Sequence, residues 1–424
     1  MSCRSTTNAV ESGLGRLSTA QPAIVRSIAL LSWVVVTIGC SNRPVAELER
    51  EELFNLSIGP MEDQLSLFQF RNLPASDSAS LYMRDGLIYV ANSGAQKVMK
   101  FSSYGDLLLL LYNPDSNPAP VSVPLRDTGD TISTRRSVPY PFIAVQDVLV
   151  DSRKIIFVQD VAPRGRAIQQ ENGIQLRQIV LRFSRQGIPL PAIGQEGLEG
   201  WPFPYIQHMY LTDSDELVVV ARERTLWIVY WYSPAGLLRY RLELTPDILP
   251  TPAATEERMS LEQVFPDVTR PVLFLYFRPI ISVDAADGRA AQESAAEIHI
   301  LDVATARYLD SFALPDSGTR QYAIGASVVE VAAPFYYPLG FSSGGTVFLL
   351  RRESDSLISL LLVDSRGRAL SQRYLTLDDN ELYFSVFRLA NTGVIYGLLG
   401  EIDRARIVWW RSDRLTEGGE RFTL

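Results

Sequence analysis

Cysteine and histidine, which often serve as nucleophiles, general bases and metal ligands, are scarce in this chain. The two cysteines, Cys3 and Cys40, lie in the first tenth of its 424 residues, and the two histidines are His208 and His299. Beyond residue 40, a cysteine nucleophile, a CxxC site and internal disulfides are therefore excluded. Neither histidine lies in a Gly-x-Ser-x-Gly or HExxH motif. We interpret them as one exposed polar residue and one hydrogen-bonded strand residue, and we expect no zinc.

Carboxylates are the other candidates for chemistry, because calcium needs only oxygen ligands. Two acidic runs could supply them, Asp213-Ser214-Asp215-Glu216 and Asp378-Asp379-Asn380-Glu381. Neither has the spacing of an EF-hand, and carboxylates in turns are usually solvated turn formers. We therefore expect neither run to be a catalytic or metal site, and we expect no cofactor. Asp and Asn side chains from distant segments could still converge on one site.

Cys40 is the residue with the clearest chemical role. The apolar run 27–39 follows Arg26 and would span about 20 Å as a helix, short of the ~30 Å hydrocarbon core. Its end, Ile38-Gly39-Cys40, resembles the lipobox of bacterial lipoproteins, in the relaxed spirochaete type because Thr37 replaces Leu or Val. The resemblance implies cleavage after residue 39, a diacylglycerol thioether on Cys40 and an anchored chain facing the periplasm or exterior. Plain secretion and an uncleaved anchor are the alternatives.

Composition limits the partners. The chain has 40 basic and 48 acidic residues, a net charge of −8, which gives no electrostatic footprint for nucleic acid. It has no glycine-rich phosphate loop for a nucleotide. After the leader, no apolar run reaches the ~18 residues of a transmembrane helix. We expect attachment to the membrane through the lipid anchor, and other envelope proteins as partners.

The elements that must position the remaining side chains are strands. From Gln64 onward, short β-rich runs alternate with polar turns, and long helical periodicity is scarce. The clearest unit is 80–113, where four runs are joined by turns rich in Gly, Asn and Asp, which tolerate positive φ. Its segments Ile88-Tyr-Val-Ala-Asn-Ser-Gly94, Val98-Met-Lys-Phe101 and Gly105-Asp-Leu107 resemble the NHL repeat of β-propellers. The resemblance implies that this unit is one four-stranded blade.

The same order of runs returns five times, within 145–193, 208–244, 272–314, 339–377 and 384–410. Bare blades need about 40–45 residues each, so we expect insertions at 114–141, 163–175, 245–271 and 284–296. In the fourth unit, the first two strands are expected at 272–277 and 280–283. The sequence thus predicts an all-β fold, a β-propeller of six four-stranded blades over 63–424, after a signal peptide (1–39) and a lipidated N-terminus and linker (40–62). Seven blades, or two stacked sheets, are the alternatives.

The sixth unit shows only three clear strands. The segment Gln64–Phe70 alternates with period two, and we predict that it supplies the fourth strand and so closes the ring. The stretch 41–62 is expected to be a tether with at most one helical turn.

Aromatic residues are the remaining candidates for binding. Most of them, including those in 227–232 and 409–410, are expected between blades in the core. Two proline-flanked segments precede strands and are predicted to line a partner-binding rim. The predicted contact residues are Trp201, Phe203, Tyr205, Phe335, Tyr336 and Tyr337.

These observations favour an envelope lipoprotein that is not an enzyme and whose propeller is a protein-binding scaffold. One alternative is a calcium-dependent hydrolase or lyase, because the NHL resemblance permits lyase activity. It would require three or more buried, unpaired carboxylates or amides at the axis. The other is a carbohydrate-binding surface lipoprotein, with exposed Trp side chains beside a groove.

Overall fold

The computed structural model describes residues 46–67, 79–121, 135–169, 173–245, 259–279, 295–315, 319–324, 327–332, 334–377 and 382–417. The predicted signal peptide, Cys40, the expected strand at 280–283 and the acidic run 378–381 lie outside these residues. Within them, no helix has the length and apolar character needed to cross a bilayer.

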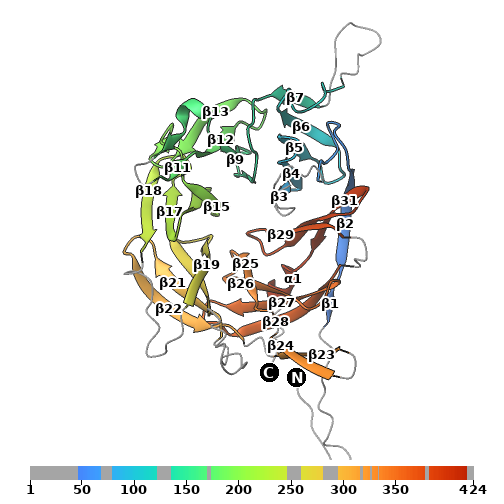
Figure 1. Ribbon diagram of the computed structural model, residues 1–424, viewed down its shortest axis with the longest axis vertical. Coiled ribbons are helices and arrows are strands. Elements are labelled where there is room, and N and C mark those ends of the chain that lie inside the picture. Colours follow the sequence, from blue (N-terminus) through green and yellow to red (C-terminus); the bar gives the residue numbers. More distant parts are fainter. Residues whose placement is uncertain are drawn as a thin grey trace, which may run out of the picture. The chain divides into compact units, whose positions relative to one another are not determined.

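Six sheets, each with four antiparallel strands at its core, follow one another around an axis, which confirms the all-β class and the six-bladed propeller (Figure 1). From the axis outward, blade 1 contains β3 (Ala79–Arg84), β4 (Leu87–Asn92), β5 (Lys97–Phe101) and β6 (Leu107–Tyr112). Blade 2 contains β8 (Val148–Val150), β9 (Ile156–Val161), β12 (Gln178–Phe183) and β13 (Pro189–Gly194), and blade 3 contains β15 (Tyr205–Leu211), β16 (Leu217–Glu223), β17 (Leu226–Tyr232) and β18 (Leu238–Leu244). Blade 4 contains β19 (Met259–Pro266), β20 (Val272–Pro279), β21 (Glu297–Asp302) and β22 (Arg307–Ala313). Blade 5 contains β25 (Tyr337–Phe341), β26 (Thr346–Arg352), β27 (Leu357–Asp364) and β28 (Ala369–Thr376), and blade 6 contains β29 (Phe384–Leu389), β30 (Ile395–Gly400), β31 (Arg404–Trp410) and β2 (Arg50–Ser57).

Short elements supplement the blades. Three short strands extend a blade at its outer edge: β7 (Arg136–Pro139) on β6, β14 (Gly197–Leu198) on β13 and β1 (Glu47–Leu48) on β28. Two hairpins stand apart from the six sheets, β10 (Ile168–Gln169) with β11 (Gln175–Leu176) and β23 (Thr319–Ile324) with β24 (Ser327–Ala332). The described helices are the 3₁₀ turn η2 (Arg164–Arg166) and α1 (Arg414–Glu417).

The inner strands of each blade are continuous apolar runs because both faces of the blade are buried. Along β4, Ile88 and Val90 pack into the core between blades 6 and 1, whereas Tyr89 and Ala91 pack into the core between blades 1 and 2. Six such clusters of buried side chains occur, one at each blade interface. Burying a large apolar side chain contributes about 1.5–3 kcal/mol, so these interfaces hold the ring together.

An N-terminal strand closes the ring, as predicted, but the strand is β2 rather than Gln64–Phe70. β2 pairs antiparallel with β31 and buries Phe54 and Leu56 between blades 6 and 1. The sequence interpretation placed these residues in a tether because the acidic run 47–52 obscured the apolar alternation. Charges are tolerated here because an outermost strand is exposed to solvent along one side.

Blade 4 also differs from the expectation. Its innermost strand is β19, which lies inside the expected insertion 245–271, and the segment expected first is the second strand, β20. The pairing of β19 with β20 shifts register between Leu261 and Gln263, so that Glu262 forms a bulge. This extra residue breaks the period-two pattern by which the strand would have been recognised.

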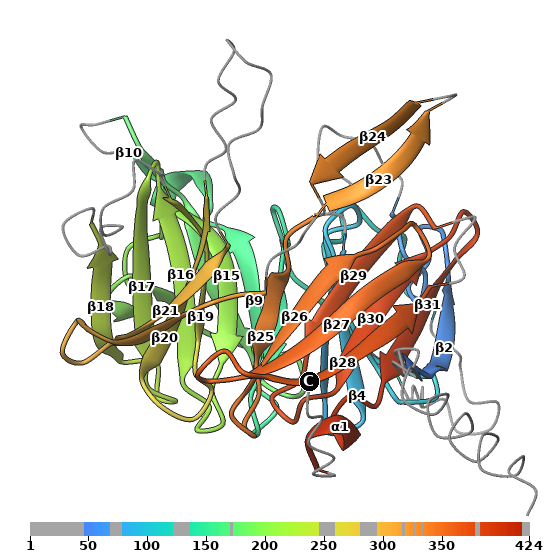
Figure 2. The same ribbon diagram turned by 90° about the horizontal axis from the view of Figure 1, so that it is seen from below.

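The two ends of the strands carry different connections. Because the strands alternate in direction, the turns from first to second and from third to fourth strands lie at one end of each blade, which we term the turn end. The connections from second to third strands and from blade to blade lie at the other, the insertion end. Figure 2 shows β10 and the β23–β24 hairpin on one side of the ring and α1 on the other. The described insertions therefore gather at the insertion end.

Candidate functional site

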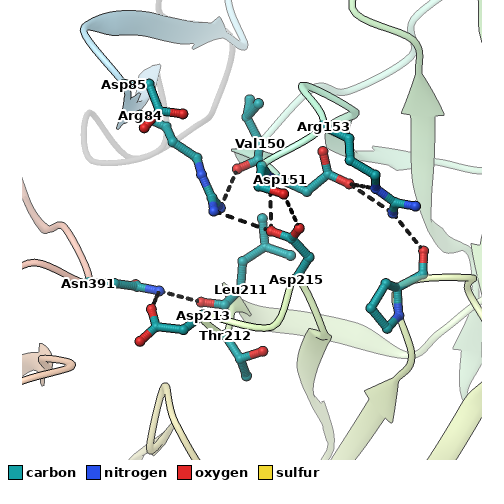
Figure 3. Close-up of polar contacts among 12 residues, drawn as sticks. Arg84, Asp85, Val150, Asp151, Arg153, Leu211, Thr212, Asp213, Asp215 and Asn391 are labelled. Atoms are coloured by element: carbon teal, nitrogen blue, oxygen red, sulfur yellow. Dashed lines mark hydrogen bonds and ion pairs between the residues drawn. The ribbon is translucent and has the colours of Figure 1, made fainter.

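The turn end of the ring is held by polar contacts that cross the axis (Figure 3). In the turn after β29, the Asn391 amide donates to the Leu211 carbonyl oxygen at 3.2 Å and to Asp213 Oδ1 at 2.8 Å. Asn391 belongs to blade 6 and Asp213 to blade 3, on opposite sides of the ring. Arg84 of blade 1 pairs with Asp215 of blade 3 at 3.3 Å. These contacts obstruct the axis at the turn end.

The acidic run 213–216 is therefore a structural tie rather than a free set of ligands. Asp215 accepts hydrogen bonds from the backbone N–H of Ser152 at 2.8 Å and from its hydroxyl group. Glu216 accepts from Trp231 Nε1 at 2.8 Å and from Arg239. Within the described part of the chain, no group of three or more His, Cys, Asp or Glu side chains could hold a metal ion.

Farther along the axis lies an ion pair joining three blades. The Nη2 atom of Arg388, on β29, donates to Asp147 Oδ1 at 2.7 Å and to the Ser80 hydroxyl at 3.3 Å. The Ser80 hydroxyl in turn donates to the same Asp147 oxygen, which also accepts the Val148 N–H at 2.9 Å. Asp147 is buried and comes just before the innermost strand of blade 2. One carboxylate at the axis is thus neutralised by one guanidinium group.

His208 belongs to the same neighbourhood and is not the exposed residue that the sequence suggested. It lies in β15 and is half-buried, with its ring 6.0 Å from that of Tyr210. Burial lowers the pKa of His208 to about 4, and the positive charge of Arg388 acts in the same direction. The imidazole is therefore neutral at pH 7. His299, in β21, contacts Glu297 through Nε2 at 2.9 Å.

Near the turn end, the axis widens into a small cavity of about 60 Å³. Its lining has one charged side chain, Arg388, together with Asn391 and three tyrosines, Tyr82, Tyr210 and Tyr396. The other lining residues are apolar apart from Gly340, and none carries a carboxylate. We call this space the axial cavity. It is neither the cluster of unpaired carboxylates expected of an enzyme nor the apolar plug expected of a pure scaffold.

A larger hollow of about 460 Å³ lies between blades 4 and 5, toward the insertion end. We call it the blade 4–5 groove, and its lining residues are Glu262, Gln263, Tyr276, Arg278, Pro334, Phe335 and Tyr337. The Arg278 guanidinium group lies 5.5 Å from the centre of the Phe335 ring, a cation–π contact. The Tyr276 hydroxyl donates to the Tyr336 carbonyl oxygen at 2.7 Å and so ties the two blades beneath the groove.

The six aromatic residues predicted to bind a partner divide into two groups. Trp201, Tyr205 and Tyr337 are 59%, 50% and 42% exposed, and Phe335 is partly buried in the groove. Phe203 is fully buried against Tyr230, with ring centroids 5.1 Å apart.

Tyr336 is the other buried member. The Arg351 guanidinium carbon lies 4.4 Å from the centre of the Tyr336 ring. The Tyr336 hydroxyl group hydrogen-bonds the Ser359 hydroxyl group at 3.0 Å. Alternation explains the burial of Tyr336 between Phe335 and Tyr337. Trp201, Phe203 and Tyr205 are two residues apart and would share one face of a regular strand. Phe203 is buried because it lies before β15 and pairs with Gln178 of blade 2 in an isolated β-bridge.

Sequence reasoning did not single out Arg388, Asp147, Glu262 or Arg278. The one available signal was a charged residue inside a predicted strand, which Arg388 provides. Arg278 lay between the strands expected at 272–277 and 280–283. Asp147 and Glu262 gave none, because a carboxylate near a turn or in an expected loop is ordinary.

No protein-family model matches the chain, and no curated protein matches it either. Among solved structures, it is similar to a member of the DUF4221 family from Bacteroides vulgatus, with a TM-score of 0.40 and 9% identity over 86% of this chain and 97% of the other. An ulvan lyase of a polysaccharide lyase family has a TM-score of 0.38 and 10% identity over 88% of this chain and 86% of the other. A gluconolactonase from Xanthomonas campestris has a TM-score of 0.37 and 10% identity over 86% of this chain and 97% of the other.

Proposed function

We propose that this protein is a lipid-anchored envelope protein whose propeller is a non-enzymatic scaffold, and that it binds a protein partner at the insertion end. The blade 4–5 groove is the observation that carries the proposal. Its volume of about 460 Å³ falls in the range of about 300–1,000 Å³ typical of ligand sites. The turn end, by contrast, uses its polar side chains to hold the blades to one another.

The groove combines the chemical groups that bind a polypeptide segment. Tyr337 and Phe335 offer flat apolar surface, which is enriched where proteins bind one another. Glu262 and Arg278 add opposite charges at its edge, and the Gln263 amide can donate and accept hydrogen bonds. We favour a protein over a carbohydrate because the exposed Trp201 does not line this groove.

Attachment through Cys40 is a separate part of the proposal, which rests on the lipobox resemblance. Cys40→Ala removes the thiol that would carry the diacylglycerol group. We expect this variant to lose acyl-chain labelling and to leave the membrane fraction. Unchanged labelling and membrane association would overturn the lipoprotein assignment without touching the groove.

The binding role is tested by co-purification from detergent-solubilised envelopes, with partners quantified by mass spectrometry. Tyr337→Ala and Arg278→Glu alter the groove, and each should lower recovery of the same partner about tenfold. Tyr104→Ala is the matched control, because Tyr104 is 87% exposed in the β5–β6 turn at the turn end. A partner lost with Tyr104→Ala but retained by both groove variants would place the binding surface elsewhere.

A further inference from the structure

Arg388 has hydrogen-bonding capacity that the protein does not use. A guanidinium group carries five N–H donors, and here Nη2 makes the bonds to Asp147 and Ser80. Within the described part of the chain, Nε and Nη1 have no hydrogen-bond partner. Arg388 lines the axial cavity, and no carboxylate lines that cavity with it. Arg388 is thus the one charged residue of the lining, and its ion-pair partner, Asp147, lies outside the lining.

Two tyrosines of the same lining also keep a proton to donate. Among the described residues, neither the Tyr82 nor the Tyr396 hydroxyl has an acceptor for its hydrogen, and the neighbours that act on them, Arg84 and the Met83 backbone N–H, are themselves donors. Each hydroxyl group thus retains its own hydrogen. Burial raises the pKa of Tyr82 to about 12 and that of Tyr396 as well, so both phenols stay protonated at neutral pH. We propose that the axial cavity binds a small carboxylate anion through Arg388, Tyr82 and Tyr396.

The size and lining of the cavity restrict the ligand further. A buried water molecule needs about 10–15 Å³ of such space, so the cavity of about 60 Å³ holds the equivalent of roughly four to six. Acetate and propionate are of this size. Leu149, Met209, Leu211, Val268 and Phe341 supply an apolar wall for a short aliphatic tail. Because Nη2 belongs to both two-donor edges of the guanidinium group and bonds Asp147 and Ser80, the ligand would accept single N–H bonds from Nε or Nη1.

The inference is independent of the proposed scaffold role, because the cavity and the blade 4–5 groove have no lining residue in common. It also differs from a metal-dependent site, since the charge in the cavity is a cation. A free phosphate ion would use the same donors but would gain nothing from the apolar wall. Comparing phosphate with a short carboxylate therefore separates binding due to charge from binding due to the apolar wall.

The first experiment titrates the full mature chain with sodium propionate, with propionamide and with phosphate, and follows binding by isothermal calorimetry. We expect saturable propionate binding at one site, at least tenfold tighter than propionamide, which has the same shape without the charge. Equal binding of propionate and propionamide, or no binding of propionate, would overturn the proposal. Phosphate binding tighter than propionate would overturn the assignment to a carboxylate.

The second experiment removes the cation. Arg388→Gln should abolish the preference for propionate over propionamide, but it leaves the buried Asp147 without its partner, which is costly to the fold. The double variant Arg388→Gln with Asp147→Asn removes both charges and keeps the protein testable. Arg153→Gln is the control, since Arg153 pairs with Asp151 at the turn end, outside the cavity. Propionate binding retained by the double variant would exclude Arg388 as the ligand-binding group.

A third measurement uses His208 as a local reporter. An anion beside Arg388 would offset the charge that helps to lower the pKa of His208, so saturating propionate should raise that pKa. The chain has two histidines, and His299→Asn assigns their NMR signals. A His208 titration that is identical with and without saturating propionate would place the bound ligand away from the axial cavity.

Discussion

The turn end and the insertion end are built from the same strands, yet they use their side chains differently. At the turn end, Asn391 and Arg84 reach acceptors two or three blades away, so the contacts of one turn depend on the position of several blades. At the insertion end, the corresponding contacts join neighbours along the chain, as when Gln96 of blade 1 donates to the Ile143 carbonyl just before blade 2. Trp201, Tyr205 and Tyr337 extend from this end into solvent.

This difference indicates that one end of the ring stabilises the fold and that the other is available for binding. Side chains that satisfy each other across the axis stabilise the fold and have little left to offer a partner. Exposed aromatic groups on short connections contribute little to the fold and can be used for binding. Substitutions at the turn end should therefore lower stability, whereas substitutions of exposed residues at the insertion end should weaken binding and leave stability almost unchanged.

The largest effect on stability is expected from Asp215→Ala. This change removes the acceptor of two bonds from Ser152 and of the Arg84 ion pair, and it places Ala at a φ of 60°. The free energy of unfolding should fall by about 2–4 kcal/mol, measured by urea denaturation. Asp85→Ala is the matched control, because Asp85 is also in a turn with positive φ but its pair with Lys154 is exposed. If both variants lost the same stability, the contacts across the axis would contribute nothing.

The second prediction concerns pH and the middle of the axis. Because the folded pKa of His208, about 4, lies below its unfolded value of about 6.5, the unfolded chain binds a proton more readily between these values. Stability should therefore be fully present above pH 6.5 and should fall by up to about 3 kcal/mol as pH drops to 4. Urea midpoints at pH 7, 5.5 and 4 measure this loss, and His208→Asn should remove that part of it. Equal pH dependence in both proteins would mean that water reaches His208 freely.

A smaller loss is expected from Asn391→Ala. The variant lacks the bonds to Leu211 and Asp213 but keeps the Asn391 carbonyl oxygen, which accepts from the Ser343 N–H at 2.7 Å. Unfolding should become about 1–2 kcal/mol easier. Asn55→Ala, which cuts an exposed bond to Glu52, should change stability by less than about 0.5 kcal/mol. Hydrogen exchange in the turn 212–216 should accelerate only in the Asn391 variant.

Much of the ring could be predicted from local pattern because each blade repeats one order of strands and turns. The runs ending at Phe101, Phe183 and Tyr232 were placed correctly, since each is followed by a Ser-x-x-Gly turn whose glycine has a positive φ. The errors have physical causes. In β2, acidic residues on an exposed edge obscured Phe54 and Leu56, and in β19 a bulge at Glu262 broke the alternation.

The candidate sites could not be predicted in the same way. Ser80, Asp147 and Arg388 come from three blades and meet only because the ring closes, so no spacing along the chain encodes their contact. The blade 4–5 groove likewise pairs Arg278 with Phe335 across a blade interface. Single aromatic residues were partly predictable, because alternation separates Tyr336 from Phe335 and Tyr337, whereas the burial of Phe203 depends on its bridge to Gln178 of another blade.

The smallest effect on stability is expected from Trp201→Ala, and it is the most direct test of the insertion end. The residue is 59% exposed, and its hydrogen bonds are made by the backbone, which alanine keeps: the N–H donates to Glu196 Oε2 at 2.8 Å and the carbonyl oxygen accepts from the Gln195 N–H at 2.8 Å. The free energy of unfolding should therefore change by less than about 0.5 kcal/mol, as for other exposed positions. A loss above about 1 kcal/mol would show that this ring supports the fold, as Phe203 does two residues later. Unchanged stability together with weaker recovery of the envelope partner would instead assign Trp201 to the binding surface, because the two measurements would then separate at a single residue.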